Sequence, residues 1–248
     1  MAQPGKVRLV RNAAYYSWIV GLTLLFASTA AVFAQNSNPA LERVLSQMDD
    51  TAANFRSAQA DFAWDQFQQV VNEHDIQKGK IYFRRNGKET QMLADISEHN
   101  GQPIQKTLLY SDGKVQVYEP KVERVTVYSP GKNRSDVESF LVLGFGGSGR
   151  DLLKSFDVKY AGTETIDGVQ TARLELVPKS KSVRGMFDRF ILWVDPARGA
   201  SLQQQAFEPG TGDYRLTKYS NIQINQKLPD NVFKLKTTGK TKFVTPQG

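Results

Sequence analysis

The chain has 248 residues, of which 40% are hydrophobic and 23% charged, so its composition is that of a globular protein and not of a disordered one. Its net charge is +7, but residues 1–34 hold three basic side chains and no acid, which leaves +4 for residues 35–248. A charge this small does not indicate a nucleic-acid partner. The absence of cysteine excludes disulfides, thiol nucleophiles and thiolate metal sites.

Residues 1–34 have the pattern of a secretory signal peptide. A basic start leads into a long apolar stretch that ends in Val32-Phe33-Ala34, which predicts cleavage after Ala34. The apolar stretch is nearly long enough to span a bilayer, so an uncleaved membrane anchor is the alternative. In both cases we expect residues 35–248 to lie outside the cytoplasm and to form one domain.

The next segment, residues 38–57, predicts an amphipathic helix. Apolar residues recur at spacings of three and four between Leu41 and Phe55. Pro39 suits the first turn, and Ser37 or Asn38 suits the N-cap. We therefore expect this helix to cover an apolar surface.

After this helix the hydrophobic period changes to two, which predicts strands. The strand-like runs cover residues 59–71, 78–85, 89–97, 106–120, 123–130, 157–166, 169–178, 187–196, 201–209 and 214–225. Asp112-Gly113 is a typical tight-turn pair. Helical patterns appear between the two groups of strands, over residues 134–145 and 146–156. The fold class expected is α+β, mainly β, with an antiparallel meander.

Residues 144–149 read GFGGSG and match the G-x-G-x-x-G dinucleotide signature. That signature requires a strand before the glycines and a βαβ unit around them. Gly144 instead follows a helix-like run. The segment is therefore interpreted as a flexible connector.

No catalytic or metal-binding constellation emerges from the remaining residues. The two histidines, His74 and His99, lie in polar, turn-like stretches without ligand spacing. Asp61 and Asp65 flank Trp64 and are interpreted as solubilising residues. We expect no enzymatic activity, no metal and no cofactor. Helices across the open face of a curved sheet would either enclose an apolar cavity or complete a filled core, and the pattern alone leaves both open.

The order of motifs over residues 40–246 resembles the periplasmic outer-membrane lipoprotein carrier proteins, the LolA family. The most specific stretch is LLYSDGKVQVYEPKVERVTVY, residues 108–128, which is similar to a hairpin of that family. KGKIYFRRNGK, VESFLVLGFGG and FILWVDPARG resemble further family segments. The resemblance implies a curved, incomplete antiparallel β-barrel with helices that form a lid over an apolar cavity.

The function that the resemblance implies is transport of acylated lipoproteins or lipid through the periplasm. An inner-membrane release transporter would load a monomeric carrier, and an outer-membrane receptor would accept the cargo, with transient contact at the membrane surface. The alternatives are a binding or sensor module for another lipid or a protein partner, and an exported hydrolase. The basic stretch 179–185 offers a surface for a phospholipid or a partner, or is simply solvated.

The resemblance also assigns site residues. Arg85, with Arg84 as the neighbouring candidate, would hydrogen-bond lid-helix carbonyls as a latch, whereas an ordinary charged strand end is the alternative. The candidates for the cavity wall, chosen by strand parity and helix face, are Phe62, Trp64, Ile81, Phe83, Met92, Leu141, Phe145 and Trp193. A parity error of one residue would invert several of these assignments.

Overall fold

The computed structural model describes residues 38–246 except 88, 132, 133, 135–137, 139, 141 and 142. Helix α1 (Pro39–Asn54) is followed by the strands and by short helices that include η1 (Pro120–Val122), α3 (Gly149–Ser155) and α4 (Lys181–Arg184). The strands are β1 (Ser57–Gln68), β2 (Glu73–Asn86), β3 (Glu89–His99), β4 (Gln102–Ser111), β5 (Lys114–Glu119), β6 (Arg124–Tyr128), β7 (Phe156–Ile166), β8 (Val169–Pro178), β9 (Arg189–Asp195), β10 (Ala200–Phe207), β11 (Tyr214–Ile224) and β12 (Lys242–Val244).

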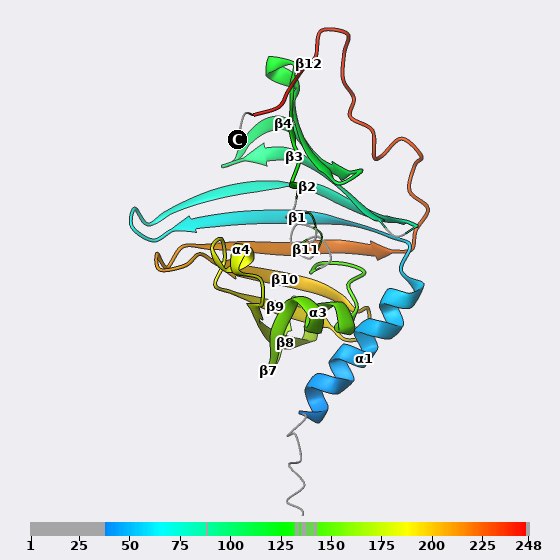
Figure 1. Cartoon of the computed structure of the whole chain (residues 1–248), viewed down its shortest axis with the longest axis vertical. Helices are drawn as coiled ribbons and strands as arrows, with labels where there is room; N and C mark the ends of the chain where they lie inside the picture. Colours follow the sequence, from blue (N-terminus) through cyan, green and yellow to red (C-terminus); the bar gives the residue numbers. More distant parts are fainter. Residues whose placement is uncertain are drawn as a thin grey trace, which may run out of the picture. The chain divides into compact units, whose positions relative to one another are not determined.

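All described strands belong to one open, curled sheet in the order β12-β6-β5-β4-β3-β2-β1-β11-β10-β9-β8-β7 (Figure 1). Two antiparallel meanders, β1–β6 and β7–β11, join where β1 pairs with β11. The short β12 adds to β6 in the parallel direction. The mainly β, antiparallel fold predicted from the sequence is confirmed.

The tight turns form where the sequence predicts them. Asp112 and Gly113 have φ angles of 54° and 69°, and Asp167 and Gly168 have 48° and 79°. A two-residue turn with both φ angles positive matches the twist of an antiparallel hairpin, and Asp-Gly is well suited to it. These turns fix the register of β4 on β5 and of β7 on β8.

Helix α1 begins at Pro39, and the side chain of Asn38 caps it by accepting a hydrogen bond from Ala40 N at 3.0 Å. Its buried face consists of Val44, Leu45, Met48 and Ala52. The helix packs against α3 and β7. The helix ends at Asn54 because Phe55 is already extended. This end lies three residues before the end of the predicted segment.

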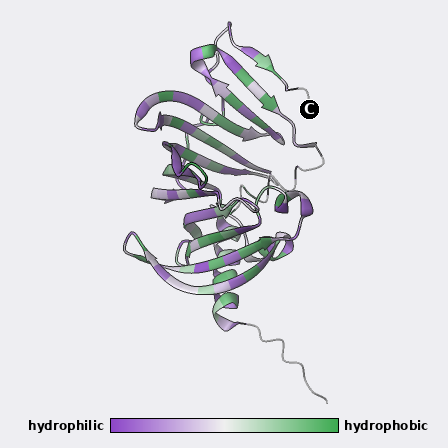
Figure 2. Ribbon diagram, turned by 90° about the vertical axis from the view of Figure 1, so that its left-hand side faces the viewer, coloured by the Kyte–Doolittle hydropathy of each residue, from purple (hydrophilic) through white to green (hydrophobic). Residues whose placement is uncertain are grey.

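The core is divided between the two faces of the sheet. One inner cluster joins α1 and α3 to β7–β10, and a second lies over β1–β4 around Phe55 and Phe145. On the outer face, the C-terminal stretch packs Leu228 and Phe233 against Leu93 and Leu109. Apolar and polar residues accordingly alternate along many strands (Figure 2). No helix in the described part of the chain is long and apolar enough to cross a membrane.

The segment 144–149 is a connector, as predicted, but it is packed and not flexible. Gly144, Phe145 and Gly149 are buried. A Cβ atom on Gly149 would lie 2.5 Å from the carbonyl oxygen of Leu45, so glycine permits α3 to approach α1. The preceding predicted helix lies largely outside the described residues, of which Arg134, Glu138 and Phe140 are helical.

Candidate functional site

A cavity of about 600 Å³ lies on the inner face of the sheet. Its floor comes from β1–β5, β10 and β11, and Phe140, Leu143, Gly144, Phe187 and Phe190 contribute to its wall. Residues 143–148 lie beside the cavity, between β6 and α3 in the chain. We call them the lid segment. The volume and the mostly apolar lining are in the range of small-molecule binding sites.

Four of the predicted cavity residues line this cavity. They are Trp64, Ile81, Phe83 and Met92. Phe62 belongs to the same apolar cluster and packs on Trp64, with 4.3 Å between the ring centroids, but it lies behind the lining. Leu141 lies outside the described residues.

Phe145 does not line the cavity but lies in the second inner cluster, the one over β1–β4. Its side chain is 1% exposed, and its ring centroid lies 5.1 Å from that of Phe83 and 5.0 Å from that of Tyr219. Burial around Tyr219 raises the pKa of its phenol. The lid segment is thus attached to the sheet through Phe145 and, in the other inner cluster, through the buried side chain of Leu143.

Arg85 holds the lid segment and α1 together at the end of β2. Its Nη1 donates to the carbonyl oxygen of Ala52 at 2.6 Å, and its Nη2 donates to the carbonyl oxygen of Gly146 at 2.8 Å. Ala52 lies in the last turn of α1, and its carbonyl oxygen also accepts from the backbone N–H of Phe55 at 3.3 Å. The guanidinium fork therefore bridges two separate elements with charge-assisted hydrogen bonds.

Comparison with known proteins identifies the family. The model of the family described as outer membrane lipoprotein carrier protein LolA matches residues 53–236. The chain belongs to the LolA family. An outer-membrane lipoprotein carrier protein of Cupriavidus pinatubonensis is 30% identical over 225 residues, which cover 88% of this chain and 91% of that protein.

Two solved structures are similar to this chain. An uncharacterized conserved protein from Thermus thermophilus superposes with a TM-score of 0.54 at 9% identity, over 84% of this chain and 99% of that one. A putative outer membrane lipoprotein-sorting protein domain from Vibrio parahaemolyticus gives a TM-score of 0.41 at 15% identity, over 78% and 97%. At such identities the likeness concerns the fold alone.

Arg84, the second latch candidate in this LolA-family chain, makes its contacts elsewhere. Its Nε and Nη2 donate to Gln91 Oε1 at 3.1 and 2.8 Å, and its guanidinium lies 4.4 Å from the ring centroid of Phe233. Adjacent strand residues point to opposite faces, so Arg84 holds the C-terminal stretch on the outer face. Of the two arginines, Arg85 is the one that reaches helix and lid carbonyls.

The prediction that Trp193 lines the cavity is wrong. Its Nε1 donates to Glu164 at 2.7 Å, and Arg173 lies 5.8 Å from its ring centroid. Leu192 and Val194, its neighbours on β9, belong to the inner cluster that joins α1 and α3 to β7–β10. Trp193 therefore points to the outer face. Because residues 190–195 are all buried, their hydrophobicity showed no alternation from which to assign a face.

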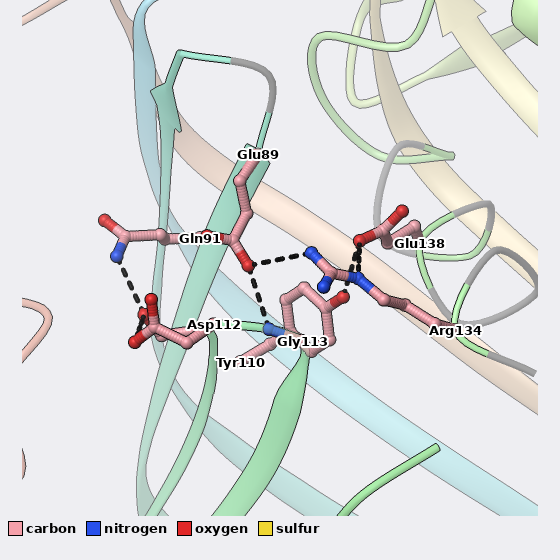
Figure 3. A network of polar contacts seen from close by, with 8 residues as sticks. Glu89, Gln91, Tyr110, Asp112, Gly113, Arg134 and Glu138 are labelled. Carbon is pink, nitrogen blue, oxygen red and sulfur yellow. Dashed lines mark hydrogen bonds and ion pairs between the residues drawn. The ribbon is translucent and has the colours of Figure 1, made fainter. Parts of the chain in front are cut away.

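A polar network that no sequence pattern indicated lies just before the lid segment (Figure 3). Tyr110 donates its hydroxyl to Glu138 at 2.9 Å, and Arg134 Nε donates to the same carboxylate oxygen at 2.8 Å. Glu89 accepts from Arg134 at 3.4 Å and from the backbone of Gly113 at 2.9 Å. The network thus joins Arg134 and Glu138 to β3, to β4 and to the turn between β4 and β5.

Titration of Tyr110 should change the free energy of unfolding at high pH. Burial and the hydrogen bond to Glu138 raise the pKa of Tyr110 from 10.0 to about 12. The stability from this phenol is complete below its unfolded pKa of about 10 and is lost as the pH rises through its folded pKa. We expect the free energy of unfolding to fall more steeply between pH 10 and 12 in the wild type than in Tyr110→Phe, as measured by urea unfolding. Parallel pH profiles would contradict this assignment.

The titratable residues considered for catalysis lie in ion pairs. Asp61 bonds Lys80 and Asn221, each at 2.6 Å, and the hydrogen bonds from Asn221 and Lys80 lower the pKa of Asp61. His74 lies on β2, not in a turn, 2.8 Å from Asp65. His99 is the last residue of β3, and its Nε2 lies 2.5 Å from Oδ1 of Asp75. Among the described residues, no three His, Cys, Asp or Glu side chains gather as a metal site.

Proposed function

We propose that the protein is a periplasmic carrier that binds the acyl chains of lipoproteins in the inner cavity and moves them from the inner to the outer membrane. The observation that supports this most is the apolar cavity beside a lid segment that Arg85 attaches to α1. Each methylene group removed from water contributes about 0.8 kcal/mol. An acyl chain therefore binds without any covalent chemistry, and we propose a binding function and not an enzyme.

Entry of the chain would require the lid segment to move. The closed form is stabilised by the two hydrogen bonds of Arg85, by Phe145 and by a 3.0 Å bond from Ser201 N to the carbonyl oxygen of Gly144. A hydrogen bond to a charged group contributes about 1.5–3 kcal/mol. Burial of roughly four methylene groups offsets one such bond, so an acyl chain supplies enough energy to exchange the closed form for an open one.

The proposed cycle also needs export and partners. Residues 1–34 would be removed as a signal peptide after Ala34, and residues 35–248 would act as a monomer without cofactor. An inner-membrane transporter would load the carrier and an outer-membrane receptor would unload it. For transient contact with the membrane surface, the chain offers Val70 and Val71 at the β1–β2 turn, which are 90% and 55% exposed, and the basic stretch at α4.

A vesicle experiment tests the carrier function. Vesicles that contain a diacylated, fluorescent peptide are incubated with the protein and then sedimented. The proposal predicts that the protein brings the acylated peptide into the supernatant as a stoichiometric complex, whereas an unacylated peptide does not form one. Release of no acylated peptide, combined with tight binding of the unacylated form, would favour a module that recognises protein and would contradict the carrier function.

A further inference from the structure

A row of neutral polar side chains crosses the floor of the cavity. Gln204 on β10 pairs with Thr217 on β11, Thr217 pairs with Trp64 on β1, and Trp64 pairs with Gln77 on β2. All four residues line the cavity. We call Gln77, Thr217 and Gln204 the polar band.

The polar band separates two different ends of the cavity. Toward Arg85, the wall includes the apolar residues Ile81, Phe83, Met92, Leu108 and Val115. In the other direction, toward the β1–β2 turn, the polar residues Gln66, Asp75 and Arg215 lie beside the apolar residues Ala206 and Phe190. Polar groups are therefore more numerous toward one end of the cavity, which suits a ligand with an apolar chain and a polar group at one end of that chain.

Gln204 has an unpaired donor. Its amide nitrogen Nε2 is buried and has no hydrogen-bond partner among the described residues. Gly144 of the lid segment covers it, since a Cβ atom at Gly144 would lie 3.0 Å from this nitrogen and 3.3 Å from the hydroxyl of Tyr219. Because a buried, unpaired donor is costly, the closed form is destabilised at this point. Displacement of the lid segment would uncover the amide.

We propose that the polar band binds the neutral ester or amide carbonyl that links an acyl chain to the rest of its molecule, with Gln204 as the donor. This inference rests on the proposed function, because it places the chain itself in the apolar end. A neutral amide and a hydroxyl suit a neutral carbonyl, whereas a carboxylate or phosphate would favour a free cation. Among the described residues, the two cations that line the cavity lie outside the polar band, since Arg215 is already bound by Glu208 at 3.1 Å and Lys106 lies on β4.

Opening of the lid and recognition of the carbonyl are coupled in this arrangement. Ser201 N holds the carbonyl of Gly144, and Arg85 holds that of Gly146, so both bonds keep Gln204 covered. When they break, the amide gains access to an acceptor on the ligand. A ligand with a carbonyl at the polar band thus stabilises the open form more than a bare hydrocarbon does.

The test compares methyl palmitate with heptadecane in the full-length mature protein, each competing with the apolar fluorophore N-phenyl-1-naphthylamine. In Gln204→Leu, we expect the ratio of ester to alkane affinity to fall about tenfold. Gln203→Leu is the matched control, because Gln203 precedes Gln204 on β10 and points to the opposite face. The ratio should remain at the wild-type value in this control.

An unchanged ratio in Gln204→Leu would overturn the inference, as would an equal loss of affinity for both ligands. Failure of the proposed function gives a different result, since the wild type would then bind neither methyl palmitate nor heptadecane. If Gln203→Leu lowered the ratio as much as Gln204→Leu does, the effect would arise from β10 as a whole, and the role of the polar band would be contradicted.

Discussion

Replacing Arg85 with leucine should leave the protein folded but shift its lid toward the open form. The substitution removes the hydrogen bonds to the carbonyl oxygens of Ala52 and Gly146. Two bonds to a charged donor contribute about 3 kcal/mol or more in the closed form, which corresponds to at least a hundredfold change in the ratio of closed to open molecules. We expect faster uptake of an apolar fluorophore in stopped-flow measurements, and slower release of bound acyl ligand, because closure no longer expels it.

Arg84→Leu is the matched control for this experiment. Arg84 is the same residue type on the same strand, but it contacts Gln91 and Phe233 on the outer face. Its replacement should lower stability by about 1–2 kcal/mol and leave the uptake rate unchanged. Equal uptake rates in Arg85→Leu and in the wild type would show that Arg85 is an ordinary charged strand end.

Replacing Phe145 with alanine should weaken the fold and strengthen ligand binding together. The loss of a fully buried phenylalanine lowers the free energy of unfolding by about 3–5 kcal/mol. The ring packs between Phe83 and Tyr219 beside the cavity, so an acyl chain that enters this region must displace it. Without the ring, we expect the affinity for acyl ligands to rise about tenfold or more.

Phe156→Ala separates these two effects. Phe156 is 2% exposed and belongs to the other inner cluster, where its ring lies 5.7 Å from that of Phe190. In urea unfolding, Phe156→Ala should lower the free energy of unfolding by a similar amount. In fluorescence titration, its affinity for acyl ligands should not rise. A decrease in acyl affinity in Phe145→Ala would instead mean that Phe145 is part of the ligand-binding surface and not a group that the ligand displaces.

Local signals in the sequence were sufficient for most of the elements, though not for α4 and β12, and for many connections. The spacing from Leu41 to Phe55 predicted α1, and Asp112-Gly113 predicted a hairpin with the correct turn residues. The long-range pairing of β1 with β11 joins residues about 160 positions apart, as in Asp61 with Ser220, and no local pattern encodes it. That pairing brings Gln204 and Thr217 beside Trp64 and so creates the polar band.

The site was predictable only in part. Strand parity placed Ile81 and Phe83 on the inner face correctly because polar and apolar residues alternate along β2. The same rule failed at Trp193, where both faces of β9 are buried. The bonds of Arg85 to Ala52 and Gly146 depend on tertiary packing, and Arg85 was singled out from Arg84 by family resemblance, not by periodicity.

The central claim, that the inner cavity holds acyl chains, is tested most directly by native mass spectrometry of the protein purified from the periplasm, followed by extraction of any bound lipid. The account predicts a co-purifying species of defined mass that carries acyl chains, and a larger fraction of this species in Arg85→Leu. Protein that is purified empty and that also fails to bind an apolar fluorophore would contradict the claim.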